Sequence, residues 1–268
     1  MPADVRVVRD VVYSRYGQRE LKVDVYLPPG AREGTRAPGV LVVRGGGWRT
    51  GDKEAFAFIA GQLAKEGFVA VSVEYRASGE AKFPAAVHDV KAAVRWMRAH
   101  AATYGIDTSA IGAIGGSAGG HLVALLATTG DLASLEGSGG DAMSSSRIHA
   151  AVAMACVCNL GAGNEAVAAF IGEPLSAHRE TLRLASPVTH VSKGSAPLLL
   201  LHSRTDPVVE FAQSVEMEAA YRRAGAQATL RVIDAPNNHA FWNDARFFPE
   251  TMRHAVEFLR ANLRTRPR

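Results

Sequence analysis

Six short, mainly apolar runs between residues 40 and 233 constrain the fold of this chain more than any other feature. Continuous apolar runs are typical of strands covered on both faces, whereas a strand with one face in water alternates apolar and polar residues. Most of the stretches between the runs have helical spacing, most clearly residues 84–104, where Pro84 suits the first helical turn. Strands that alternate with helices predict βαβ units and a parallel sheet. The six runs are Val40–Val43, Val69–Val73, Ile111–Ile114, Ala150–Ala155, Leu198–Leu201 and Leu230–Ile233.

The two ends of the chain predict other elements. Near the N-terminus, "VRVVRDVVY" and "LKVDVYL" are rich in strand-forming residues and are separated by the turn-prone "SRYGQRE", so an antiparallel hairpin at a sheet edge is expected. Near the C-terminus, residues 252–263 have helical spacing. A length of 268 residues is compatible with one α/β domain, and no internal repeat or linker interrupts it. We therefore expect a single domain over residues 1–268.

The composition excludes several classes of protein. Hydrophobic residues make up 47% and charged residues 21%, which is ordinary for a folded domain. The formal net charge is +4, and its one compact basic group is the C-terminal tail of Arg264, Arg266 and Arg268. Because no aromatic-studded basic motif accompanies this tail, we interpret it as a solvated end and expect no nucleic-acid partner.

The cysteines and the N-terminus bear on the cellular compartment. Cys156 and Cys158 lie in an apolar run and have no further ligands at metal spacing, so we interpret them as buried strand thiols. The N-terminus has no apolar core of a secretory signal, and no run of about 18 apolar residues could span a membrane. We expect a cytoplasmic protein without a membrane partner.

The strongest local signal is "IGAIGGSAGGH", which contains the G-x-S-x-G pattern at residues 115–119. It follows an apolar strand and precedes a helical stretch, the context in which this pattern forms a nucleophile elbow. The alternative is a plain glycine-rich turn. In an elbow, Ser117 is the nucleophile, and the N–H of Ala118 at the start of the helix donates to an oxyanion.

A serine nucleophile needs a base and an orienting carboxylate. Asp206 follows the apolar run in "PLLLLHSRTDPVV", and His239 lies in "LRVIDAPNNHAFW", after the last predicted strand. The order Ser117, Asp206, His239 is the one used by strand–elbow–helix hydrolases. Both partners would lie at carboxyl ends of strands, where open α/β sheets bind ligands.

Other residues compete for these roles. His202 lies at the end of its strand and is interpreted as structural, and His121 lies in the helix after the nucleophile, facing away from the position of a base. Asp234 is close before the loop that carries the histidine, and Glu210 follows Asp206. We favour Asp206 and His239 over all four.

The stretch "VLVVRGGGW" at residues 40–48 ends a predicted strand in three glycines. Side chains at these positions would block the approach of an oxyanion, so the loop is a candidate source of backbone donors beside the elbow. A phosphate-binding loop is excluded, because "GGWRTGDK" lacks the adjacent Gly-Lys-Ser/Thr, and the dinucleotide G-x-G-x-x-G pattern is not matched either.

Taken together, "LKVDVYLP", "RGGGWRTGDK", "VEYRAS", "FPAAVHDVKAAVRWMR", "IGAIGGSAGGHL", "ASPVTHV", "LLLLHSRTDPVV" and "NNHAFW" make the chain resemble α/β-hydrolases. More narrowly, it resembles carboxylesterases near the hormone-sensitive-lipase group, including bacterial feruloyl and acetyl-xylan esterase-like proteins. The resemblance implies an eight-stranded, mostly parallel sheet flanked by helices, with a Ser-Asp-His triad and no cofactor or metal. It also implies an oxyanion hole formed by Gly46, Gly47 and Ala118, and Trp48 at the pocket wall.

The chain departs from this family at three positions. Arg44 stands where a histidine is usual, Ser203 where a glycine often follows His202, and Asn238 where a glycine often precedes the catalytic histidine. A guanidinium offers more donors than an imidazole and a permanent charge. Our hypothesis is that Arg44 braces the glycine loop and takes no part in the chemistry.

The function expected from these residues is hydrolysis of small-molecule carboxylic esters through an acyl-enzyme. A possible small cap within residues 159–186 favours short acyl groups such as acetyl, although its helices could equally well only pack against the flank of the sheet. An arylformamidase or amidase on the same scaffold is the alternative, and a catalytically silent binding protein is a third reading. The sequence does not define an oligomeric state.

Overall fold

The computed structural model describes residues 4–32, 34–130, 132–141, 143–161 and 163–264. In this part of the chain, eight strands form one sheet in the order β1-β2-β4-β3-β5-β6-β7-β8. The pairs β1/β2 and β2/β4 are antiparallel, and all other neighbours are parallel. The α/β class and the mostly parallel sheet are thereby confirmed. The strands are β1 (Arg6–Tyr16), β2 (Arg19–Leu27), β3 (Ala37–Val43), β4 (Val69–Val73), β5 (Ile106–Gly116), β6 (Ala150–Met154), β7 (Leu198–His202) and β8 (Ala228–Val232).

Both faces of the central strands are buried, as their continuous apolar sequences predict. Successive strand residues point to opposite faces. In β3, Leu41 and Val43 join one hydrophobic core, while Val40 and Val42 join a second core on the other face. Five of the six predicted runs match their strands to within about three residues, and β5 begins five residues earlier than predicted.

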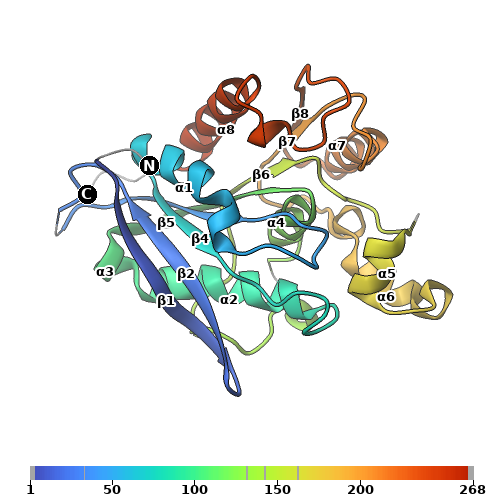
Figure 1. Cartoon of the computed structure of the whole chain (residues 1–268), viewed down its shortest axis with the longest axis horizontal. Coiled ribbons are helices and arrows are strands. Elements are labelled where there is room, and N and C mark those ends of the chain that lie inside the picture. Colours follow the sequence, from blue (N-terminus) through green and yellow to red (C-terminus); the bar gives the residue numbers. More distant parts are fainter. Residues whose placement is uncertain (1–3, 33, 131, 142, 162, 265–268) are drawn as a thin grey trace.

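Helices cover the two faces of the sheet. The helices α1 and α8 contribute to one core and α2, α4 and α7 to the other, so the molecule has three layers (Figure 1). The α-helices are α1 (Ala57–Lys65), α2 (Ala85–Ala99), α3 (Ala101–Tyr104), α4 (Ala118–Thr128), α5 (Glu165–Ile171), α6 (Arg179–Ala185), α7 (Ala212–Ala224) and α8 (Phe248–Asn262). Short 3₁₀ turns are η1 (Lys53–Phe56), η2 (Ala133–Leu135), η3 (Leu175–His178), η4 (Pro187–His190) and η5 (Phe241–Asn243).

The predicted helix over residues 84–104 is two helices. His100 leaves helical geometry, with φ −102° and ψ 17°, and separates α2 from α3. Pro84 precedes α2 and does not lie in its first turn, with φ −96° and ψ 16°. The apolar stripe runs through both helices, so spacing alone did not reveal the break.

The N-terminal hairpin is present as β1 and β2, at the edge of the sheet. Cys156 and Cys158 are buried free thiols, although they follow β6 and are not part of it. Arg266 and Arg268 lie outside the described residues. None of the described helices is both long and apolar enough to cross a bilayer.

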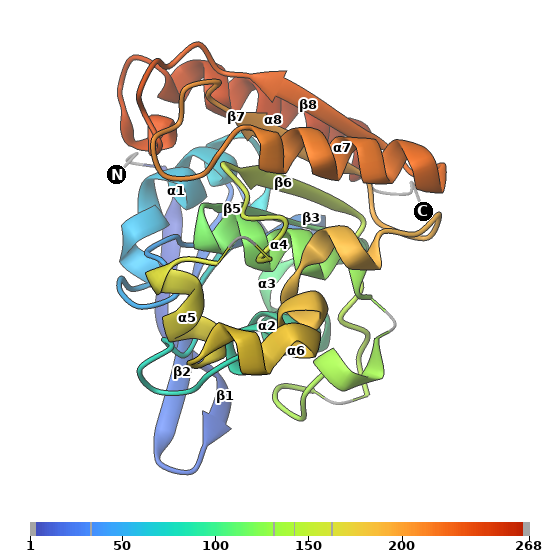
Figure 2. The same ribbon diagram turned by 90° about the vertical axis from the view of Figure 1, so that its right-hand side faces the viewer.

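The parallel strands place the candidate residues at one edge of the sheet. The glycine loop follows β3, the serine elbow follows β5, and Asp206 and His239 follow β7 and β8. Because β3, β5, β6, β7 and β8 run in the same direction, these loops leave the sheet on the same side. The small helices α5 and α6 lie next to each other at one flank of the molecule (Figure 2).

Candidate active site

Ser117 occupies a tight elbow between β5 and α4. Its backbone has φ 54° and ψ −121°, a left-handed conformation that is unusual for a residue with a side chain. The elbow is packed closely against the end of β3. A Cβ atom at Gly119 would lie 2.1 Å from the Val43 carbonyl oxygen and 2.4 Å from that of Arg44, so only glycine fits there. The G-x-S-x-G pattern thus corresponds to a sharp strand-to-helix turn and not to a loose glycine-rich turn.

Ser117, His239 and Asp206 form one hydrogen-bonded chain. The Ser117 Oγ lies 2.9 Å from His239 Nε2, and His239 Nδ1 lies 2.8 Å from Asp206 Oδ2. With Nδ1 donating to the carboxylate, Nε2 is left to accept a proton from the serine hydroxyl. These are the distances and the order that serine activation requires.

The carboxylate of Asp206 is held from several sides. Its Oδ1 accepts hydrogen bonds from the N–H groups of Val208 and Val209, at 2.8 and 2.9 Å. Burial acts to raise the pKa of Asp206, but contacts from His202, His239 and the two N–H groups outweigh it and hold the pKa below its ordinary value. The group is therefore ionised at neutral pH and can stabilise an imidazolium at His239.

Two hydroxyl groups join the loop of Asp206 to the loop of His239. Ser203 Oγ donates to the Ala235 carbonyl at 2.6 Å, and Thr205 Oγ1 accepts from the Asn237 N–H at 2.9 Å. Ser203 is one of the departures from the family pattern, and its hydroxyl supplies a contact that glycine could not. A second departure, Asn238, donates through Nδ2 to the Asp244 carboxylate at 3.2 Å. Both departures thus add bonds that fix these loops.

The four residues that competed with Asp206 and His239 for the roles of acid and base have other contacts or lie at the surface. His202 is buried, with Nδ1 2.7 Å from Ser214 Oγ and Nε2 3.0 Å from the Val209 carbonyl oxygen. Asp234 and Glu210 are exposed. His121 is buried behind the glycine loop, and both of its ring nitrogens have partners.

The glycine loop lies directly against the elbow. A Cβ at Gly45 would be 2.9 Å from the Gly116 carbonyl oxygen and 3.4 Å from the Cβ of Ser117. Gly46 has φ 106°, and its carbonyl accepts from the Arg49 and Thr50 N–H groups, which turns the loop back on itself. Within the described residues, the N–H groups of Gly46 and Gly47 donate to no acceptor. Ala118 begins α4, where N–H groups lack an intrahelical acceptor.

Arg44 has the contacts expected of a brace for this loop. Its Nη1 donates to the Gly45 carbonyl at 3.0 Å and to the Thr50 carbonyl, and its guanidinium stacks 4.1 Å from the ring centroid of Tyr75. The residue is 3% exposed. The Tyr75 hydroxyl in turn donates toward the carbonyl oxygens of Arg44 and Gly45, at 3.2 and 3.4 Å. Sequence reasoning missed Tyr75, because only the folded chain brings it to the loop.

Trp48 differs from its predicted position at a pocket wall. It is 2% exposed, its indole Nε1 donates to His121 Nδ1 at 3.1 Å, and its ring stacks on Phe170 with centroids 4.7 Å apart. The indole therefore supports the loop from inside the protein and presents no open face. Phe170 was not singled out from the sequence. Its position in a short amphipathic segment gave no signal beyond ordinary packing.

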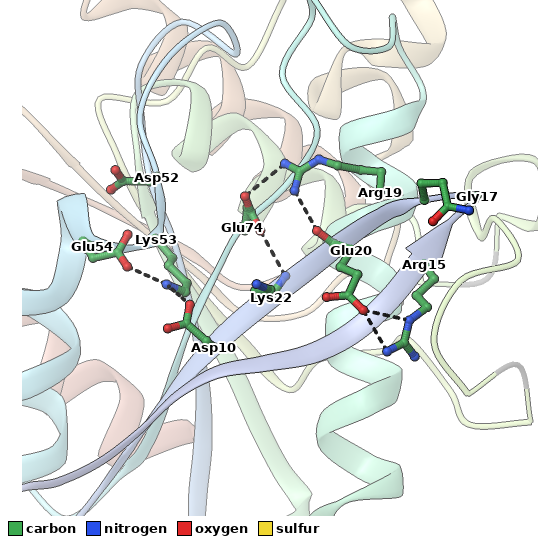
Figure 3. A pocket seen from close by; sticks show the side chains of 11 residues that line it. Asp10, Arg15, Gly17, Arg19, Glu20, Lys22, Asp52, Lys53, Glu54 and Glu74 are labelled. Atoms are coloured by element: carbon green, nitrogen blue, oxygen red, sulfur yellow. Dashed lines mark hydrogen bonds and ion pairs between the residues drawn. The ribbon is translucent and has the colours of Figure 1, made fainter.

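A second polar region lies beside the hairpin, in a groove of about 650 Å³ (Figure 3). Lys53, 7% exposed in its side chain, lies 3.0 Å from an Asp10 oxygen and 3.3 Å from an Asp24 oxygen. Arg19 pairs with Glu74 at 3.0 Å. We call this region the charged groove. It is lined by Asp10, Arg15, Gly17, Gln18, Arg19, Glu20, Lys22, Asp52, Lys53, Glu54 and Glu74.

The sheet order, the elbow and the loops at the carboxyl edge define an α/β-hydrolase. Comparison with known proteins gives the family: the BD-FAE family model matches residues 23–221, and the chain belongs to that family. This confirms the resemblance inferred from the motifs.

Among curated proteins, those similar to the chain include two from Mycobacterium tuberculosis. Esterase LipQ is 34% identical over 235 residues, which cover 84% of this chain and 55% of LipQ. The probable carboxylic ester hydrolase LipM is 31% identical over 242 residues, which cover 87% of this chain and 56% of LipM. The chain therefore spans about half the length of these relatives.

Solved structures that are similar over nearly their whole length include the following two. A truncated carbohydrate esterase from gut microbiota has a TM-score of 0.81 and 30% identity, covering 95% of this chain and 96% of its own. Propionate-bound esterase 2 of Thermogutta terrifontis has a TM-score of 0.81 and 28% identity, covering 99% of this chain and 97% of its own.

Proposed function

We propose that this chain is a serine hydrolase that cleaves short-chain carboxylic esters. The observation that carries the proposal is the combination of the 2.9 Å Ser117–His239 contact with the N–H groups of Gly46 and Gly47 in the loop beside it, which have no acceptor among the described residues. A positioned nucleophile and base need such donors, because the tetrahedral intermediate places negative charge on the former carbonyl oxygen. The names of LipQ and of the gut carbohydrate esterase support the same reaction class.

The reaction proceeds in two halves. His239 Nε2 takes the proton of Ser117 Oγ as this oxygen attacks the acyl carbonyl, and the N–H groups of Gly46, Gly47 and Ala118 stabilise the oxyanion. His239 then gives the proton to the leaving alcohol, and the acyl-enzyme remains. Water attacks this ester by the same route. Asp206 holds the imidazole in the required tautomer and stabilises its charged form throughout.

Arg44 acts in this scheme by holding the loop that supplies two of the donors. Its bonds to the Gly45 and Thr50 carbonyl oxygens span the glycine turn. Because the guanidinium only donates, it binds the loop's carbonyl oxygens and does not compete for the N–H groups of Gly46 and Gly47.

The acyl preference is proposed from the size of the cap. The described part of residues 159–186 contains two α-helices of seven residues each and one 3₁₀ turn of four. The Leu160 N–H donates to Ser186 Oγ at 3.0 Å, which ties the two ends of the segment together. Such a short insertion offers little apolar surface for a long acyl chain. The Thermogutta esterase bound to propionate and to butyrate supports the same range.

A rate series tests the substrate class. We expect kcat/KM for p-nitrophenyl esters to fall steadily from acetyl or propionyl to octanoyl, and Ser117→Ala to reduce every rate to the background. An N-formyl aniline and p-nitroacetanilide serve as the amide arm. Faster turnover of these than of the esters would favour the arylformamidase or amidase alternative, and an optimum at octanoyl would contradict the short-chain assignment.

A further inference from the structure

The oxyanion loop, residues 44–51, contains a strained residue that needs external support. Trp48 has φ 59°, in the left-handed region that residues with side chains rarely adopt. Such a conformation persists only where the surroundings fix it, and it is frequent at sites where a precise loop geometry is used. Because Trp48 directly follows Gly46 and Gly47, whatever holds the indole also holds the two N–H groups in place.

Three contacts hold the indole. Its ring is stacked on Phe170 of α5, with an interplanar angle of 14°. The His121 ring meets the indole edge-on, with ring centroids 5.2 Å apart, and the indole Nε1–H donates to His121 Nδ1 at 3.1 Å. We call Trp48, His121 and Phe170 the Trp48 cluster. Of the three, the hydrogen bond to His121 is the most directional, since it depends on one donor and one acceptor atom.

His121 can accept this bond only as a neutral imidazole with its proton on Nε2. That nitrogen donates to the Ala185 carbonyl, at the end of α6, over 2.7 Å. The residue is fully buried, and burial lowers its pKa to about 4, which keeps the ring neutral. His121 also lies one helical turn after the nucleophile, and its backbone N–H donates to the Ser117 backbone carbonyl at 2.9 Å.

We propose that His121 is a positioning residue for the oxyanion loop: it holds Trp48, and with it the Gly46 and Gly47 N–H groups, beside the nucleophile. The inference rests on the proposed function, because it assumes that these groups stabilise an oxyanion. It assigns His121 no contact with the substrate. The imidazole joins three segments that are remote in sequence: the loop after β3, the first turn of α4 and the end of α6.

Steady-state kinetics with p-nitrophenyl acetate test the proposal. His121→Leu, which removes both polar contacts, should lower kcat about 10- to 100-fold with KM within about threefold, because a displaced donor weakens binding of the transition state more than of the substrate. His121→Gln offers an acceptor and a donor on one side chain and should recover most of the rate. Affinity for a short trifluoromethyl ketone, which forms a tetrahedral adduct, should fall in parallel with kcat.

Two further variants separate this role from general packing. Trp48→Phe keeps an aromatic ring on Phe170 but lacks the N–H, and its effect on kcat should not add to that of His121→Leu. His190→Gln is the matched control, because His190 Nε2 contacts the carbonyl of Leu184, next to Ala185, and in the described part of the chain its ring forms no hydrogen bond or ring contact with Trp48. Its kcat should stay within twofold of the wild type.

Folding of each variant is verified by thermal unfolding, and Trp48→Phe tests the idea even where His121→Leu does not fold. A wild-type kcat in Trp48→Phe or in folded His121→Leu would overturn the proposal, as would a loss confined to KM. Failure of the proposed function looks different: the wild-type protein itself would not hydrolyse the ester, or Ser117→Ala would retain the rate.

Discussion

The Ser117 edge of the sheet and the charged groove beside the hairpin differ in how their polar groups are satisfied. At the Ser117 edge the charges are few, and N–H groups of the glycine loop have no acceptor in the described part of the chain. In the charged groove the charges are many, and Lys53 and Arg19 are each paired with carboxylates of the protein itself (Figure 3).

This difference shows what makes a polar region chemically useful. A group already paired within the fold has little left to offer a ligand, and its pairing mainly offsets the cost of burial. An unpaired donor held beside a nucleophile keeps its bonding capacity for the transition state. Size and charge alone would favour the groove, whereas unsatisfied and positioned groups favour the Ser117 edge. Changes at the two regions should therefore separate activity from stability.

After Ser117→Ala, the largest expected effect on activity is that of Asp206→Asn. The amide keeps the shape of the carboxylate but favours the wrong tautomer of His239, so kcat should fall by about 10³- to 10⁴-fold. Stopped assays with p-nitrophenyl acetate measure it, and circular dichroism verifies the fold. A rate within tenfold of the wild type would remove Asp206 from the mechanism and reopen the choice of Asp234.

A substitution in the charged groove should instead lower stability and leave kcat nearly unchanged. Lys53→Met removes the cation between Asp10 and the buried Asp24, and should lower the free energy of unfolding by about 2 kcal/mol while kcat stays within twofold. Urea unfolding and the ester assay on the same preparation measure the two quantities. As a control, Arg15→Ala in the exposed pair with Glu20 should change stability by no more than about 0.5 kcal/mol. A large fall in kcat for Lys53→Met would show that the groove and the site are not independent.

Arg44→Ala tests whether Arg44 holds the glycine loop in the geometry that catalysis needs. Without the guanidinium, the Thr50 carbonyl oxygen loses this donor and the Gly45 carbonyl oxygen keeps only the 3.4 Å contact with the Tyr75 hydroxyl, so the loop loosens and kcat should fall about 10- to 100-fold. Arg44→His should keep most of the rate, since an imidazole also donates to a carbonyl. A normal rate in folded Arg44→Ala would contradict the role of a brace.

The last expected effect is a pH dependence of stability that leaves activity at neutral pH unchanged. The pKa of His121 is about 4 in the folded protein, below the ordinary value of 6.5, so unfolding takes up a proton as the pH falls between these values. His121 is thus fully stabilising above pH 6.5, and this contribution is lost as the pH falls toward 4. Between pH 7 and pH 4.5 the wild type should lose about 2 kcal/mol more than His121→Gln, as measured by urea unfolding. Parallel pH curves for the two proteins would contradict a buried, neutral His121.

Much of the fold could be predicted from the sequence because its signals are local. The buried strands appear as continuous apolar runs, and Val69–Val73 matches β4 residue for residue. Ser117, Asp206 and His239 come together because the ends of parallel strands share one edge. Their order along the chain was therefore enough to select them.

The remaining features depend on contacts between distant segments. The family resemblance implies that Trp48 lies at the pocket wall, yet its side chain is buried against Phe170, which is more than 100 residues away in sequence. The sequence places His121 in the helix after the nucleophile, but nothing in "IGAIGGSAGGH" indicates that its ring bonds to Trp48 and Ala185. The end of α2 at His100 was also missed, since the apolar spacing continues through it into α3.

The most direct test of the account is covalent labelling with a fluorophosphonate, followed by peptide mapping. If the carboxyl edge is the reactive region, the folded wild-type protein should form a single adduct, on Ser117, and Ser117→Ala should form none. Lys53→Met should be labelled at the wild-type rate. A folded wild-type protein that stays unlabelled, or an adduct that persists in Ser117→Ala, would contradict the assignment of Ser117 as the nucleophile.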